Sequence, residues 1–141
     1  MTITLDTNVF ISVLLGSRGG PAEIMAFWWA GSFDLAVSPP LLEEIVAVAF
    51  SERLASLIRP DEVLALVQIL EKKAFWVDGT QAGFDRDLRD PDDRMVVQSA
   101  LESGSSYLVT GNLKHLKAAD GVGGIRVVSP REFIGCLSKA R

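Results

Sequence analysis

The sequence predicts an α/β fold built around a parallel sheet, and three observations predict it. Short apolar runs alternate along the chain between strand-like and helical spacing, as in repeated strand–helix units. Two of these runs are followed by a polar residue at the position where a parallel strand would end, Asp6 and Asn112. No repeat, low-complexity segment or Pro- or Gly-rich linker divides the 141 residues. We therefore expect one domain over residues 1–141, with ligands beyond the carboxyl ends of its strands.

The expected elements are short strands that alternate with amphipathic helices. The strands are expected at residues 2–5, 33–37, 74–77, 106–109 and 125–128. The helices are expected at residues 8–15, 20–30, 39–57, 61–73, 91–104 and 130–138. This order indicates βα units around a parallel sheet.

The first strand, at residues 2–5, runs directly into Asp6 and the helix at 8–15. Asp, Thr and Asn all suit a helix start, so Asp6 can be an ordinary N-cap ahead of Thr7 and Asn8. Asp6 can equally be a carboxylate presented at the strand end, where open α/β sheets bind ligands. Both interpretations stay open from the residues alone.

Two tryptophans are adjacent in the helix expected at 20–30. Neighbouring helical residues do not face the same way, so Trp28 and Trp29 cannot both point into one core. One interpretation places one of them at the interface with a second copy of the chain or with a partner protein. The alternative is that both are partly buried in a broad core.

The helix at 39–57 follows the second strand and opens with Ser38 as its N-cap and Pro39 at its first position. Glu44 borders the apolar stripe of this helix, and Glu43 borders the opposite edge. Periodicity therefore favours Glu44 over Glu43 as the residue that faces inward.

The helix at 91–104 carries the most informative carboxylate. Asp93 shares a face with Val97 and Ala100, which is the apolar, inward face of that helix. A buried, unpaired carboxylate is costly, so on this interpretation Asp93 should be paired or bound to a metal ion. The alternative is an Asp that the helix dipole favours in a first helical turn and that faces water. Asp90, before a proline at the first helical position, suits an N-cap, and Asp92 is expected to face solvent.

Composition limits the classes of protein. The lone Cys136 excludes an intramolecular disulfide, and the N-terminus resembles no signal peptide, so we expect a cytoplasmic protein. The longest apolar run, residues 9–15, is too short for a membrane helix. A net charge of −4 argues against sequence-independent nucleic-acid binding unless bound cations offset the acidic residues locally.

Together the carboxylates of Asp6, Glu44 and Asp93 predict an oxygen-rich site of the kind that Mg²⁺ and Mn²⁺ select, and hence metal-dependent phosphate chemistry. The single His115, expected in an exposed turn, and the single Cys136 cannot build a zinc site of nitrogen and sulfur ligands. A Ser-His-Asp site would depend wholly on His115. There is also no P-loop and no dinucleotide fingerprint.

These residues resemble the PIN-domain family, and within it the VapC-like toxins of toxin–antitoxin modules, over nearly the whole chain. The resemblance is carried by four segments in a fixed order. They are Leu5-Asp6-Thr7-Asn8-Val9-Phe10, Ser38-Pro39-Pro40-Leu41-Leu42-Glu43-Glu44-Ile45, Arg89-Asp90-Pro91-Asp92-Asp93-Arg94, and Leu108-Val109-Thr110-Gly111-Asn112-Leu113-Lys114-His115-Leu116. Each segment is modest alone, and the four together are specific.

The resemblance implies a three-layer α/β/α fold with a five-stranded parallel sheet, and a ribonuclease that depends on Mg²⁺ or Mn²⁺. It implies that Asp6, Glu44 and Asp93 are the catalytic, metal-binding carboxylates and that Thr110 lines their site. Thr7 and Asn8 are expected beside them.

Asn112 occupies a place where many members of the family have Asp, and we expect it to be a further metal ligand. An amide supplies a neutral oxygen, so the choice between one and two bound ions stays open.

The partners that the resemblance implies are an RNA substrate, a cognate antitoxin protein and a second copy of the chain in a homodimer or larger assembly. One alternative is a catalytically weak PIN module that binds RNA or a protein without cutting, motivated by Asn112 and the acidic net charge. Another is a receiver-like phosphoacceptor domain. It fits less well, because receivers place an acidic pair after the first strand, where this chain has Asp6-Thr7-Asn8.

Overall fold

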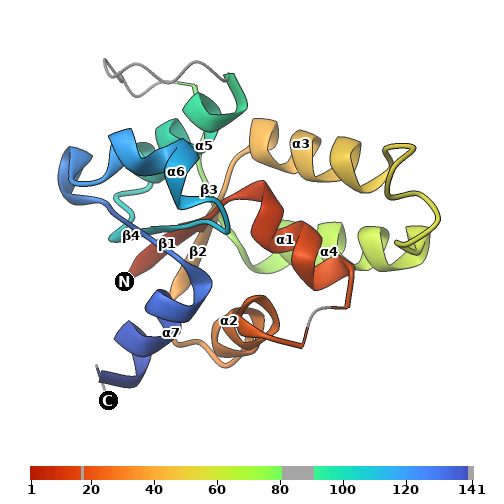
Figure 1. Cartoon of the computed structure of the whole chain (residues 1–141), viewed down its shortest axis with the longest axis horizontal. Helices are drawn as coiled ribbons and strands as arrows, with labels where there is room; N and C mark the ends of the chain where they lie inside the picture. The colour runs from red at the N-terminus through yellow and green to blue at the C-terminus, as the bar shows by residue number, and fades with distance from the viewer. Residues whose placement is uncertain (17, 81–90, 140–141) are drawn as a thin grey trace.

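The computed structural model describes residues 1–16, 18–80 and 91–139. Its centre is a five-stranded sheet in which every pairing is parallel, in the order β3-β2-β1-β4-β5 (Figure 1). The strands are β1 (Thr2–Leu5), β2 (Asp34–Val37), β3 (Phe75–Trp76), β4 (Tyr107–Val109) and β5 (Arg126–Val128). The predicted α/β class and parallel sheet are confirmed, and β1 is the central strand.

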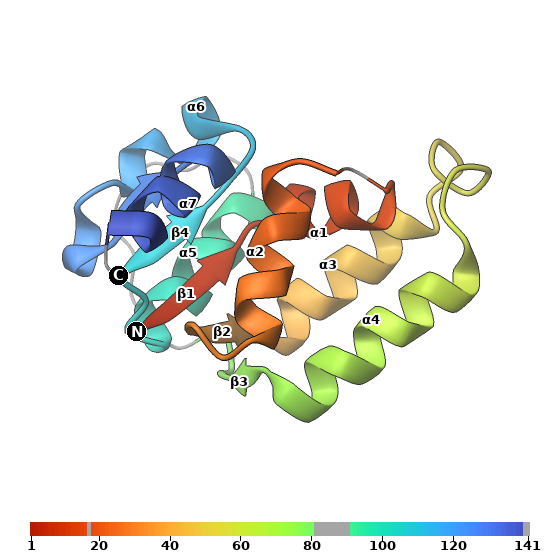
Figure 2. The same cartoon turned by 90° about the horizontal axis from the view of Figure 1, so that it is seen from below.

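Helices cover both faces of this sheet. They are α1 (Thr7–Leu14), α2 (Gly20–Trp29), α3 (Pro39–Ala49), α4 (Pro60–Lys73), α5 (Pro91–Glu102), α6 (Leu113–Leu116) and α7 (Pro130–Lys139). Helix α5 packs against β1, β2 and β4, whereas α7 packs against β4 and α2 on the other face. Figure 2 shows α1, α3 and α4 gathered beyond the sheet, where α1 packs on α3 and α3 on α4.

The inner strands β1, β2 and β4 are short, apolar and mostly buried, which is why they read as continuous apolar runs. Ile3, Leu5, Leu35 and Leu108 are fully buried between the two helical layers. This rigid centre fixes the strand ends, and all strands of a parallel sheet end at the same edge.

Three elements differ from the expectation. Helix α3 ends at Ala49 instead of residue 57, and residues 51–58 form turns. The Ser51 hydroxyl donates to the Val48 carbonyl at 2.7 Å, which satisfies a helix-end group locally. Leu54 and Ile58 are nevertheless buried. They pack into the core from turns, although their spacing in the sequence is that of one face of a helix. Strand β3 is shorter than expected, and the short helix α6 was not predicted.

The two tryptophans of α2 differ greatly in exposure. Trp28 is 2% exposed and Trp29 is 64% exposed, so the alternative in which both are partly buried is wrong. Lys73 Nζ lies 4.6 Å from the centre of the Trp29 ring and donates to the Trp29 carbonyl at 2.7 Å. Trp29 therefore presents a large apolar side chain at the surface.

Two further expectations concern membrane helices and Asp90. Within the described ranges, none of the helices combines the length and the apolar character needed to cross a membrane. The expected N-cap Asp90 lies outside the described residues.

Candidate active site

Asp6 stands at the end of the central strand and is held by three hydrogen bonds. It is the N-cap of α1, and its Oδ1 accepts from the Thr7 backbone N–H at 2.8 Å. Its Oδ2 accepts from the Thr110 hydroxyl at 2.8 Å and from the Asn8 side-chain amide at 3.1 Å. Thr110 reaches Asp6 because β1 and β4 end side by side. Both interpretations of Asp6 from the sequence therefore hold: it caps a helix and presents a carboxylate at the sheet edge.

Burial raises the pKa of Asp6 above its ordinary value. The hydrogen bonds from Thr110 and Thr7, the charge of His115 and the hydrogen bond from Asn8 act in the opposite direction and lower that pKa. Because burial dominates, the ionised carboxylate of Asp6 lacks enough nearby positive charge to compensate for its lost hydration.

Glu44 projects from α3 toward α1, where the Thr7 hydroxyl donates to its Oε2 at 2.7 Å. Burial raises the pKa of Glu44 to about 7, with further contributions from the carboxylates of Asp92 and Asp6, against the lowering effect of the Thr7 hydrogen bond. Glu43, one position earlier, is exposed. The periodicity argument for Glu44 thus agrees with its position.

Asp93 lies in the first turn of α5, and its side chain is only 17% exposed. The residues one and two turns later on the same face, Val97 and Ala100, are fully buried. Asp93 Oδ2 lies 3.9 Å from Nδ1 of His115, whose side chain is 62% exposed.

Helix α6 brings two polar side chains toward the carboxylates. Asn112 is its N-cap residue, is exposed, and donates its backbone N–H to the Thr110 hydroxyl at 3.0 Å. His115 is exposed as expected, but it lies on a helical turn that faces Asp93. This contact could not be predicted from the sequence, because a four-residue helix is too short to show a period.

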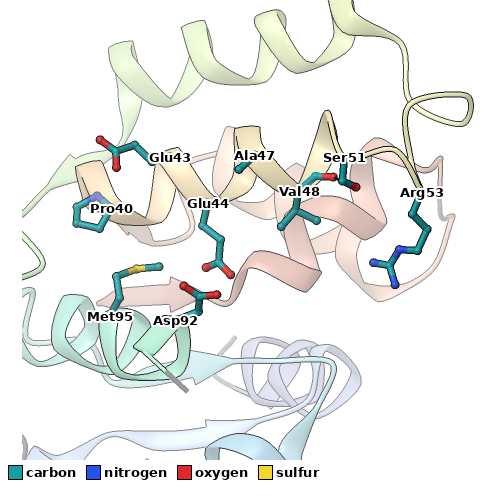
Figure 3. Close-up of a pocket in the computed structure, with 9 residues that line it drawn as sticks. All are labelled: Pro40, Glu43, Glu44, Ala47, Val48, Ser51, Arg53, Asp92 and Met95. Carbon is teal, nitrogen blue, oxygen red and sulfur yellow. Dashed lines mark hydrogen bonds between the residues drawn. The ribbon is translucent and has the colours of Figure 1, made fainter. Parts of the chain in front are cut away.

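Asp92 is exposed, as expected. Its carboxylate also faces Glu44 across the gap between α3 and α5, which was not predicted (Figure 3). Its orientation depends on the packing of α3 against α5, which helical periodicity cannot report.

These side chains line two adjoining hollows. The first, of about 350 Å³, is bordered by Asp6, Glu44, Asp93 and Asn112 together with Thr7, Asn8, Asp92 and His115. The second, of about 700 Å³, follows α3 and shares Glu44, Val48, Arg53 and Asp92 with the first (Figure 3). Four separate segments of the chain thus meet at the carboxyl edge of the sheet.

The donor chemistry of the first hollow fits a hard divalent cation. Its acidic and amide side chains offer only oxygen atoms as metal ligands when the amide nitrogen is set aside. These residues are Asp6, Glu44, Asp92, Asp93 and Asn112. Burial is the main cause of the raised pKa of both Asp6 and Glu44, and at Glu44 the neighbouring carboxylates of Asp92 and Asp6 add to it. In the described ranges no three acidic, His or Cys side chains stand close enough to hold one ion without moving.

The raised pKa values predict a pH-dependent stability in the absence of divalent metal. The Glu44 pKa is about 7 in the folded protein against 4.5 ordinarily, so the folded state binds more protons between these values. The stability it contributes is complete below pH 4.5 and is lost as the pH rises through 7, and Asp6 acts in the same direction. After discounting for solvent screening at this half-buried group, we expect a loss of about 1–2 kcal/mol. Urea unfolding in EDTA at pH 5 and pH 7.5 measures it.

The control for this prediction is Glu44→Gln, which cannot titrate. Its unfolding free energy should fall less than that of the wild type over the same interval. An equal fall in both proteins would assign the pH dependence to other groups.

Comparison with known proteins adds three findings. A family model described as PIN domain matches residues 2–114, which is most of the chain. The comparison with curated proteins gives no match. A chain in the crystal structure of VapBC2 from Rickettsia felis bound to a DNA fragment from their promoter matches with a TM-score of 0.60 and 15% sequence identity, over 92% of this chain and 98% of that one. At that identity the structural likeness concerns the fold.

Proposed function

The chain belongs to the PIN domain family, and on that basis we propose that it is a metal-dependent endoribonuclease that acts as the toxin of a toxin–antitoxin pair. One observation carries the proposal: Asp6, Glu44 and Asp93, from three separate elements, border a single hollow at the carboxyl edge of the sheet. An oxygen-lined hollow at this edge suits a divalent ion and the phosphate that it would bind.

The protein's own residues supply orientation and charge. Thr110, Asn8 and the Thr7 backbone hold the Asp6 carboxylate in one position, and the Thr7 hydroxyl holds Glu44. Asp6, Glu44 and Asp93 would hold Mg²⁺ or Mn²⁺, with Asn112 as a neutral ligand. When bound, such an ion activates water for attack on the scissile phosphate and offsets the charge that develops on its oxygens. The residues bordering the hollow supply the negative charge that holds the ion in place.

The toxin role and its partners are part of the same proposal. The solved relative is a VapBC2 complex bound to promoter DNA, and we extend only the idea of an antitoxin partner to this chain. The exposed Trp29 offers an apolar contact for a second copy or for that partner, because large aromatic side chains are enriched at interfaces. A second candidate function is a PIN module that binds RNA or protein without cutting, favoured by the neutral Asn112.

The test of the function is cleavage of single-stranded RNA with Mn²⁺ or Mg²⁺ and with EDTA. Glu44→Gln and Glu43→Gln are a matched pair, since they alter adjacent acids on one helix; both border the second hollow, but only Glu44 also borders the first, with Asp6 and Asp93. We expect Glu44→Gln to lower kcat about a hundredfold, the cost of losing one charged group that stabilises the transition state. Glu43→Gln should change kcat less than threefold. Undiminished cleavage in EDTA would contradict the metal mechanism, and absent cleavage with RNA binding would favour the second candidate function.

A further prediction concerns Asn112. Replacing it with Asp adds one negative charge beside Asp6 and Asp93 at an exposed position. Isothermal titration should show tighter binding of Mn²⁺, by about fivefold to tenfold, and thermal melts without metal should shift downward because the carboxylates repel one another. Unchanged Mn²⁺ affinity would show that the side chain at 112 points away from the ion.

A further inference from the structure

Arg53 is the feature of the two hollows that the proposed chemistry does not use. It lies in the turns that follow α3 and borders both hollows. Among the described residues that border them, it is the one side chain with a permanent positive charge, and the other basic residue is His115. A lone guanidinium beside several carboxylates therefore needs an explanation.

Arg53 has no partner among the residues that the structure describes. It is exposed, and no hydrogen bond or ion pair joins it to another residue in the part of the chain that the structure describes. Arg59, six positions later, contrasts with it because its guanidinium pairs with Asp61 at 3.1 Å. Arg53 thus keeps all its donors free for a ligand, and a guanidinium is well shaped to bind phosphate oxygens.

The position of Arg53 indicates which phosphate. Figure 3 shows Glu44 and Asp92 facing each other near the middle of the long hollow, with Arg53 at the end of α3 farthest from Pro40. From Glu44 to the end of α3 is roughly 8 Å along the helix axis. Arg53 is thus displaced along the long hollow from Glu44 and Asp92, and it also borders the first hollow.

We propose that Arg53 is a substrate-positioning residue that binds a phosphodiester group of the RNA next to the scissile one. This inference rests on the proposed ribonuclease function and deepens it. The protein is acidic overall, with a net charge of −4, so the positive charge of Arg53 in the long hollow offsets the repulsion that a polyanionic RNA strand meets there. Val48 and Met95 line the same long hollow and offer apolar surface beside the contact with the RNA backbone.

The first experiment measures RNA binding as a function of salt. A single-stranded RNA oligonucleotide is titrated onto wild type, Arg53→Gln, Arg53→Lys and the control Arg131→Gln, all with Ca²⁺ in place of the active metal. Arg131 is exposed on α7 and borders neither hollow. The plot of the logarithm of the RNA association constant against the logarithm of the salt concentration should be less steep by about 0.7 in Arg53→Gln, the value for one phosphate contact on a single strand. It should stay unchanged in Arg53→Lys and Arg131→Gln. An unchanged slope in Arg53→Gln overturns the inference.

The second experiment locates the phosphate. Cleavable oligonucleotides carry one neutral methylphosphonate at successive positions on either side of the cleaved bond, and kcat/KM is measured for wild type and Arg53→Gln. At one flanking position the methylphosphonate should cost wild type about tenfold, as expected for a charge-assisted contact, and should cost Arg53→Gln almost nothing. Equal costs in both proteins at every position would overturn the assignment.

The outcomes separate this inference from the function on which it rests. Cleavage by wild type with no change of slope in Arg53→Gln overturns the role of Arg53 alone. Failure of wild type to bind the RNA at all overturns both.

Discussion

Replacing Asp93 with Asn should lower kcat for RNA cleavage by a factor on the order of a thousand, the scale of losing a ligand of a catalytic ion. The reason is position: Asp93 is shielded in the first turn of α5 and borders the hollow with Asp6 and Glu44. The substitution keeps the size of the side chain and removes its charge, so the packing of Val97 and Ala100 below it should not change. Steady-state cleavage in saturating Mn²⁺ measures the effect.

The control is the stability of the same variant without metal. Because one of several neighbouring carboxylates is neutralised, the unfolding free energy in EDTA should stay level or rise. Inactivity together with a lower melting temperature would point to a folding defect. Asp93 suits this test better than Asp6. In Asp6→Asn, an amide nitrogen would replace a carboxylate oxygen that accepts a hydrogen bond from the Thr7 N–H or the Thr110 hydroxyl, and that hydrogen bond would break.

Mn²⁺ should stabilise the wild-type protein by about 2.7 kcal/mol when its concentration is a hundred times its dissociation constant, because the ion binds the folded state alone. The unfolded chain scatters Asp6, Glu44 and Asp93 over nearly 90 positions of sequence, so it offers no comparable site. Chemical unfolding at a series of Mn²⁺ concentrations measures the gain.

Two variants make this prediction specific. Asp93→Asn should lose most of the Mn²⁺-dependent gain, whereas Asp61→Asn, which alters an exposed acid on α4 outside both hollows, should keep it. The same gain in all three proteins would indicate weak binding to surface carboxylates in general.

The sequence was sufficient for features that depend on local periodicity. Short apolar runs identified all five strands, and the spacing of Asp93 from Val97 and Ala100 placed it on an inward face. The position of Asp6 followed from the end of an apolar run. These features were readable because burial on both faces of a parallel sheet leaves a continuous apolar signal.

Features that depend on tertiary packing were not readable in the same way. Asp92 is exposed as expected, but its approach to Glu44 could not be predicted, because the packing of α3 against α5 decides it. His115 reaches Asp93 through a four-residue helix that has no detectable period. The region after Ala49 keeps a helical spacing of buried residues although it forms turns, so the periodic signal overstated the length of α3.

The hydrogen bond from Thr110 to Asp6 joins residues 104 positions apart, which has a consequence for the order of folding during synthesis. Strand β1 leaves the ribosome first and can pair with β2 early, but its other edge stays open until β4 has been made. Such long-range pairing slows folding. A nascent chain that ends before residue 110 carries Asp6, Glu44 and Asp93 without the hydroxyl that orients the first of them. The geometry of the first hollow is therefore among the last features that the growing polypeptide acquires.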